Sequence, residues 1–275
     1  MAMRRFVLVT AAVLFIGPVI LWVAGATRRA QPITIVSNVK PATPGNAASG
    51  ERLGRTTLVC TECHGEDLGG KFVSDDLLFG RVVAPNLTAR KRTLAEWDLA
   101  IRHGVGANGR ALVLMPSDGY SALTVDDLSD LVAWLDGLPP VTRSLPATRL
   151  GPLGNILVFA GMLHVPAWTI AHERVTETSV ASDATKRGPY LIEISGCRGC
   201  NGATLEGHAF GPGQPVAPPL TAEALKGWSM DGFTRALREG TARDGHTLHP
   251  MMPWRSFSAL PDEDVRALWQ TLSSP

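Results

Sequence analysis

Two cysteines and a histidine stand together in the sequence Cys60-Thr-Glu-Cys63-His64. On a helix, two thiols at this spacing lie about one turn apart, where each can form a thioether bond to one of the two vinyl groups of a porphyrin. The histidine that follows can present its imidazole to the iron from one face. This pattern is the attachment signature of c-type haem, so the sequence predicts covalent haem c at Cys60, Cys63 and His64.

Other uses of the same residues fit less well. A structural zinc ion takes four protein ligands, and residues 50–139 contain no second close pair of cysteine or histidine residues. A redox dithiol or a structural disulfide needs the two cysteines but not the histidine. The adjacent histidine therefore favours haem over these alternatives.

The second axial ligand of the iron is predicted to be Met115, which is followed by Pro116. A lone methionine usually fills a core, but Met115 has a counterpart at the same spacing in a repeat described below. Ligation by histidine and methionine raises the reduction potential and leaves no open position for a substrate. His103 is the rival ligand, and its place before Gly104 favours a role at a helix C-terminus instead.

The segment around Cys60 recurs later in the chain. Cys197-Arg-Gly-Cys200-Asn201 matches the first motif, and Met252-Pro253 matches Met115-Pro116. Further pairs match in the same order: Leu68-Gly-Gly70 with Leu205-Glu-Gly207, Ala84–Thr88 with Ala217–Thr221, Ile101–Gly104 with Leu237–Gly240, and Ser121–Leu128 with Ser258–Val265. The constant order and nearly constant spacing indicate a tandem duplication of one fold. We call residues 50–139 the first repeat and residues 186–273 the second repeat.

The second repeat departs from the first where the iron ligand is expected, because Asn201 replaces the histidine. Three outcomes stay open. Cys197 and Cys200 could hold a haem with a weak or substitute ligand, for which His208, His246 and His249 are the candidates in this repeat. The two cysteines could instead form a disulfide in an oxidising compartment and leave the repeat without haem. Alternatively, Met252 could hold a five-coordinate iron that is open to small ligands.

The N-terminus predicts the compartment. Met1–Arg5 is basic, and Phe6–Ala26 is an apolar run without a charge, long enough for the roughly 20 residues of a bilayer-spanning helix. A cleaved signal peptide is the alternative, although its apolar region is usually only about 7–15 residues long. We therefore expect an inner-membrane anchor with the remainder facing the periplasm. Lys and Arg number 26 against 25 Asp and Glu, which gives no charge pattern for nucleic acid.

The pattern of helix signals predicts an all-α fold. Thr93 and Glu96 form a capping box, Thr124 and Asp127 open another helix, and Pro261 stands at the start of a third. No stretch alternates between apolar and polar residues for long. The predicted organisation is a membrane anchor or signal over 1–26, a tether over 27–49, a domain over 50–139, an interdomain linker over 140–185 and a second domain over 186–273.

Taken together, these motifs resemble the membrane-anchored di-haem class I cytochromes c of bacteria. The resemblance rests on Cys60–Gly65, Ala84–Thr88, Ile101–Gly104 and the Met115-Pro116 loop. It implies two tandem class I cytochrome c domains, a position for Pro85 near the proximal histidine, and iron ligation by Met115 and Met252. It further implies an electron carrier, not an enzyme, that exchanges electrons with a dehydrogenase, a quinol-oxidising complex or a terminal oxidase.

Overall fold

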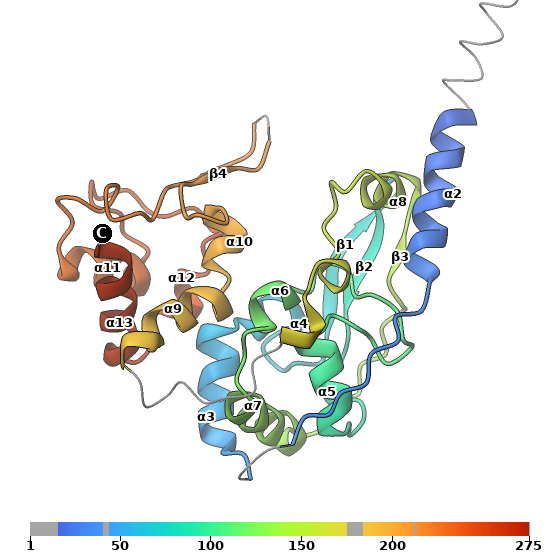
Figure 1. Ribbon diagram of the computed structural model, residues 1–275, viewed down its shortest axis with the longest axis horizontal. Coiled ribbons are helices and arrows are strands. Elements are labelled where there is room, and N and C mark those ends of the chain that lie inside the picture. The colour runs from blue at the N-terminus through green and yellow to red at the C-terminus, as the bar shows by residue number, and fades with distance from the viewer. Residues whose placement is uncertain (1–15, 41–43, 175–183, 212, 275) are drawn as a thin grey trace, which may run out of the picture.

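The computed structural model describes residues 16–40, 44–174, 184–211 and 213–274 (Figure 1). The elements over the first repeat and its N-terminal approach are α2 (Gly17–Ala30), α3 (Ala47–Arg52), η2 (Leu53–Thr57), α4 (Cys60–His64), β1 (Lys71–Asp76), β2 (Gly80–Ala84), α5 (Leu94–Ile101), α6 (Ser117–Tyr120) and α7 (Val125–Gly137). The elements that follow are β3 (Arg149–Leu150), α8 (Pro152–Phe159), η3 (Pro166–Trp168), η4 (His172–Arg174), α9 (Ala184–Ile194), α10 (Cys197–Asn201), β4 (His208–Ala209), β5 (Val216–Ala217), α11 (Met230–Glu239), α12 (Trp254–Phe257) and α13 (Asp262–Ser273).

The helices begin where the sequence predicted. The Thr93 side chain accepts from the Glu96 backbone N–H, and the Glu96 carboxylate accepts in return from the Thr93 backbone N–H, which completes the capping box of α5. Thr124 caps α7 by accepting from the Asp127 backbone N–H. Such caps satisfy backbone donors that the first turn of a helix leaves without partners.

The prediction of an all-α fold was wrong in one region. Strands β1 and β2 form an antiparallel hairpin, and β3 adds a third strand beside β2. The Asp76 carboxylate closes the turn by accepting from the backbone N–H groups of Leu78 and Phe79, at 2.8 and 2.7 Å. The sequence concealed β1 because its residues are mostly exposed on both faces and a bulge interrupts its register, so no apolar alternation develops.

The predicted tether over 27–49 was also too long. Its first four residues complete helix α2, and residues 47–49 already belong to α3. Asn46 starts α3 by accepting from the Ser49 backbone N–H at 3.0 Å, and its own N–H donates to Asp130 at 2.6 Å. A short polar cap therefore fixes the end of this segment against α7.

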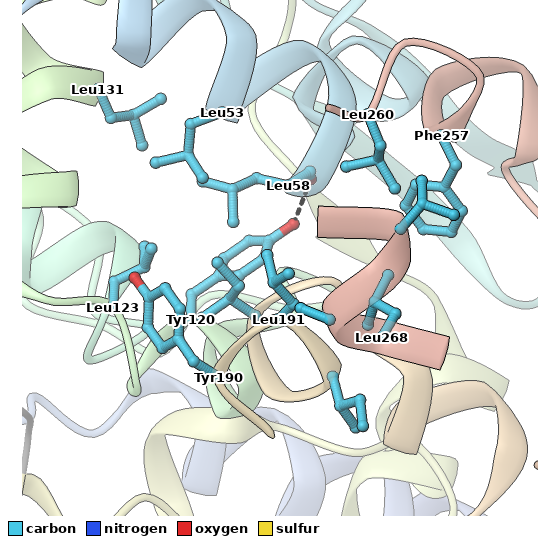
Figure 2. Close-up of a cluster of buried hydrophobic side chains, with 14 of the residues drawn as sticks. Leu53, Leu58, Tyr120, Leu123, Leu131, Tyr190, Leu191, Phe257, Leu260 and Leu268 are labelled. Atoms are coloured by element: carbon cyan, nitrogen blue, oxygen red, sulfur yellow. Dashed lines mark hydrogen bonds between the residues drawn. The ribbon is translucent and has the colours of Figure 1, made fainter. Parts of the chain in front are cut away.

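One hydrophobic core runs through both repeats. Figure 2 shows side chains of the first repeat, among them Leu58 and Leu123, beside Leu191 and Leu268 of the second repeat. The Tyr120 hydroxyl reaches across this cluster and donates to the Leu58 carbonyl oxygen at 2.5 Å. Because the apolar contacts cross from one repeat to the other, burial stabilises the two repeats together.

The segment between the repeats packs mainly on the first repeat. Strand β3 pairs with β2, and helix α8 packs against α2. A second, smaller core forms there from Val82, Val105, Leu150, Val158 and Val165, with two buried alanines. Figure 1 shows this sheet, α8 and α2 at the opposite side of the molecule from α11 and α13.

The predicted anchor over 1–26 lies partly outside the described residues, which begin at residue 16. Its remaining part belongs to α2, which continues to Ala30. Among the helices of the described residues, none is both long enough and apolar enough to cross a membrane.

We expect Tyr190→Phe to destabilise the contact between the repeats. The Tyr190 hydroxyl donates to the Asp127 carboxylate and accepts from the Thr124 backbone N–H at 3.3 Å, so its loss leaves buried polar groups of α7 without this partner. The free energy of unfolding in urea should fall by about 1–3 kcal/mol. Phe210→Leu, at an exposed position, is the control, and a Tyr190→Phe chain of unchanged stability would contradict the assignment.

Candidate haem site

Helix α4 presents the cysteines and the histidine of the first motif on one short turn. Val59, in the left-handed conformation with φ of +46°, sets the chain into this turn. Both cysteines are free thiols, with Cys60 half-buried and Cys63 exposed. Burial raises the pKa of Cys60 to about 12, and the neighbouring Cys63 adds to the rise. Burial also raises the pKa of Cys63, so both groups are neutral thiols at neutral pH.

The imidazole of His64 is fixed by one hydrogen bond. His64 is buried, and its Nδ1 lies 2.8 Å from the carbonyl oxygen of Pro85. A carbonyl oxygen only accepts, so Nδ1 donates and carries the proton. Burial lowers the pKa of His64, the bond to Pro85 opposes this shift, and Arg92 lowers the pKa further. The neutral ring thus keeps a free lone pair on Nε2, and this lone pair is what an imidazole uses to bind iron.

The predicted distal ligand lies in a tight turn before α6. Met115 is partly buried and packs against the main core. Leu114 before it has φ of +64°, and the Ser117 backbone N–H donates to the Met115 carbonyl oxygen at 2.8 Å. A leucine in the left-handed region costs conformational energy, so the surrounding structure holds this turn in place.

A buried donor supports the fit of a porphyrin to this site. Trp97 is buried on α5, with Arg92 stacked on its ring at 4.4 Å. Its Nε1–H has no hydrogen-bond partner among the described residues. A buried donor of this kind usually has a partner, and a carboxylate of a bound haem is an acceptor of the right chemistry. The sequence alone gives no signal for this donor, because the lack of a partner is visible only in the folded chain.

His103 takes part in a different contact. Its Nδ1 lies 2.9 Å from Nδ1 of His172, and its Nε2 lies 3.5 Å from the Asp98 carboxylate. His103 therefore joins the end of α5 to the segment between the repeats. The sequence had predicted only a role at the helix terminus, because the partner is 69 positions away.

The backbone of the first motif recurs at the second motif. The Gly70 N–H donates to the His64 carbonyl oxygen at 2.8 Å, and the Gly207 N–H donates to the Asn201 carbonyl oxygen at the same distance. Leu68 and Leu205, at matching positions, both have positive φ, of 52° and 62°. Two leucines in a conformation that leucine rarely adopts indicate that both loops obey the same constraint.

The Met115 turn recurs as well. The Trp254 backbone N–H donates to the Met252 carbonyl oxygen at 2.8 Å, which is the bond found between Ser117 and Met115. Both methionines are partly buried against the main core. The second repeat therefore keeps the main-chain framework of the Met115 turn.

Asn201 makes the same hydrogen bond to a proline carbonyl oxygen as His64 does. It is equally buried, and its Nδ2 donates to the Pro218 carbonyl oxygen at 2.8 Å. This is the counterpart of the bond from His64 to Pro85. An amide has no atom that corresponds to Nε2 of an imidazole. The asparagine thus keeps the structural contact and lacks the nitrogen that binds iron.

The three histidines of the second repeat lie on its surface with neighbours of their own. His246 pairs with Asp244 at 2.5 Å, and His249 accepts from the Met251 backbone N–H at 3.2 Å. His208 is exposed on β4 and packs edge-on against Phe210. The two cysteines of α10 are free thiols, and burial raises the pKa of both Cys197 and Cys200.

Comparison with known proteins agrees with this geometry. Residues 45–135 match the family model described as cytochrome c oxidase, cbb3-type, subunit III. This segment is a cytochrome c domain. It contains the thiols, the imidazole and the methionine described above, and domains of this type bind haem c covalently. The cofactor predicted from the sequence is therefore confirmed.

Relatives of the chain are cytochrome c subunits. The chain is 37% identical over 101 residues to the gluconate 2-dehydrogenase cytochrome c subunit of Pantoea cypripedii. This match covers 32% of this chain and 23% of that protein. The alcohol dehydrogenase (quinone) cytochrome c subunit of Gluconobacter oxydans is 32% identical over 95 residues, or 30% of this chain and 20% of that protein. The chain thus matches less than a quarter of the length of these two relatives.

A third relative matches most of the chain. The diheme cytochrome c-type protein of Cereibacter sphaeroides is 29% identical over 259 residues, which cover 82% of this chain and 84% of that protein. The names of these relatives describe cytochromes c or cytochrome c subunits, consistent with the prediction of an electron carrier.

We expect Asn201→His to yield a chain with two haems. The new imidazole would find the Pro218 carbonyl oxygen where Nδ2 of Asn201 now finds it, which fixes the tautomer that binds iron. The pyridine haemochrome assay and the intact mass give the number of haems per chain. Asn201→Gln, which keeps the amide, is the matched control. A single haem in the Asn201→His chain would show that the framework of the second repeat is not sufficient.

Proposed function

We propose that this protein is a membrane-associated electron-transfer cytochrome c with one haem iron held by His64 and Met115 in the first repeat. The observation that carries the proposal is the hydrogen bond from His64 to Pro85, which leaves Nε2 free of a proton. Met115 would supply a thioether as the second iron ligand. With both iron ligands supplied by the protein, the site would suit electron transfer and not substrate binding.

The residues around the motif support this role. Cys60 and Cys63 would hold the porphyrin, and the haem supplies one-electron chemistry when bound. Trp97 and Trp134 are buried in the core of the first repeat, while Cys63 is exposed. The buried core would hold the iron in one coordination state, and the exposed position of Cys63 would give a redox partner access to the edge of the haem.

The partner is proposed from the relatives. Two of them are named as cytochrome c subunits of gluconate and alcohol dehydrogenases. A further relative is named as a fructose dehydrogenase cytochrome subunit. We infer that this chain accepts electrons from a dehydrogenase and passes them to a quinol-oxidising complex or a terminal oxidase. The charge-free run Phe6–Ala26 supports an inner-membrane location, and we propose that both repeats lie on the periplasmic side.

The second repeat supports a second candidate function. Its framework matches that of the first repeat, and Asn201 leaves the proximal side without an iron ligand. Haem attached to Cys197 and Cys200, with Met252 as its protein ligand, would bind small ligands. The alternative is a second cytochrome c unit without haem that serves in docking to a partner. The two differ in the number of haems and in ligand binding.

Met115→Ala should lower the reduction potential by an amount on the order of 0.1 V and abolish the sulfur-to-iron charge-transfer band. The loss of the thioether removes the ligand that stabilises the reduced iron. Spectroelectrochemistry of the purified chain measures both changes. Met162→Ala, at an exposed position, is the control. A Met115→Ala chain with an unchanged spectrum would remove Met115 from the iron.

The natural chain should not bind carbon monoxide at the haem of the first repeat. Carbon monoxide added to the reduced protein tests for an open coordination position, and the haem count per chain is measured on the same sample. One haem and no adduct would support His64/Met115 ligation with a second repeat free of haem. Two haems with one adduct would favour the ligand-binding function. An adduct with a single haem would contradict six-coordination in the first repeat.

A further inference from the structure

Apolar side chains gather at one end of the molecule, around α2, α8 and the turn between β1 and β2. On α2, only Gly25 is buried. The exposed apolar residues at this end, which we call the apolar end, are Ile16, Val19, Ile20, Leu21, Trp22 and Val23 of α2, Leu153, Phe159 and Met162 of α8 and its C-terminal turn, and Leu77 and Leu78 of the hairpin turn. Leu77 and Met162 are 92% and 76% exposed, so neither contributes to the core.

The three elements are held together as one body. A Cβ at Gly25 would lie 1.9 Å from the Asn155 carbonyl oxygen, so α2 and α8 meet backbone to backbone. The Leu153 N–H donates to the Leu78 carbonyl oxygen at 3.0 Å, and the Gly151 N–H donates to Phe79 at 2.8 Å, which fixes the hairpin turn to the start of α8. Figure 1 shows α2 rising past α8 and the upper end of the sheet.

The charges near the apolar end are mainly positive. The sequence has no Asp or Glu over residues 1–40 or 137–172, which include α2 and α8. Arg28 and Arg29 end α2, and Arg28 stacks on the Trp168 ring at 4.3 Å. The nearby carboxylates have partners, because Asp75 pairs with Arg81 at 3.1 Å and Asp76 closes the hairpin turn. Apolar residues next to arginine and tryptophan are typical of a membrane interface.

We propose that the apolar end lies against a bilayer with anionic headgroups, with the hairpin turn and α8 touching the lipid beside α2. The proposal rests on the membrane association proposed above and adds a second contact to it. If the charge-free run Phe6–Ala26 enters the bilayer, its last part is the half of α2 that meets α8 at Gly25. That contact brings α8 and Leu77 to the level of the lipid surface, and burial of their exposed side chains in lipid is favourable.

Photocrosslinking of the full-length haem protein tests this orientation. A benzophenone amino acid, p-benzoylphenylalanine, replaces Leu77, Met162 or, as the control, Val216, which is 69% exposed in the second repeat. Each variant is reconstituted into vesicles of phosphatidylethanolamine and phosphatidylglycerol and irradiated. Lipid adducts, counted by intact mass, should be severalfold more abundant at positions 77 and 162 than at position 216.

Several results would overturn the proposal. One is equal labelling at the three positions, and another is the absence of lipid adducts at 77 and 162. Adducts at these positions between two copies of the chain would show that the face is a protein interface. For each variant, the absorption spectrum of the haem is recorded before and after reduction of the haem iron by dithionite. Lipid labelling by a protein that cannot be reduced would contradict the electron-transfer function alone, and a reducible protein without labelling would contradict the membrane contact alone.

Discussion

The hydrogen bond between Nδ1 of His64 and the carbonyl oxygen of Pro85, at 2.8 Å, determines what the first motif can do. It fixes the plane of the imidazole and places the proton on Nδ1, and these two effects leave the lone pair of Nε2 in a fixed direction. The rest of the domain maintains the bond. The Gly70 N–H ties the loop after α4 to the His64 backbone, and the His64 side chain is itself buried. Without this bond, the cysteines would still attach a porphyrin, but its iron would lack a ligand of fixed direction.

The second repeat separates the two roles of that histidine. Asn201 meets the need of the fold, because its amide satisfies the Pro218 carbonyl oxygen at the same distance. It cannot replace the histidine as an iron ligand, because the amide has no second nitrogen that corresponds to Nε2 of an imidazole. A buried carbonyl oxygen without a donor costs stability, so asparagine is a small change for the structure and a decisive one for coordination. The framework around Cys197 can thus keep its shape whether or not an iron ligand is present.

The shared core explains why the two repeats depend on each other. Leu58 and Leu123 pack beside Leu191 and Leu268, and Tyr190 of α9 binds Asp127 of α7. A change in the second repeat therefore acts on the core packing of the first. The segment between the repeats adds to this, because β3 completes the sheet of the first repeat and His172 meets His103.

The sequence alone was enough for the local chemistry and the helix starts. Cys60, Cys63 and His64 act through close spacing, and the caps at Thr93 and Thr124 span only three residues, so neither depends on distant parts of the chain. The sheet was missed because β1 is mostly exposed on both faces and pairs with β2, which in turn pairs with β3. The family resemblance placed Pro85 near His64, and the structure gives the hydrogen bond that joins them. Only the tertiary structure brought Pro218 to Asn201 and His172 to His103, because hydrogen bonds between residues 17 and 69 positions apart leave no periodic pattern in a sequence.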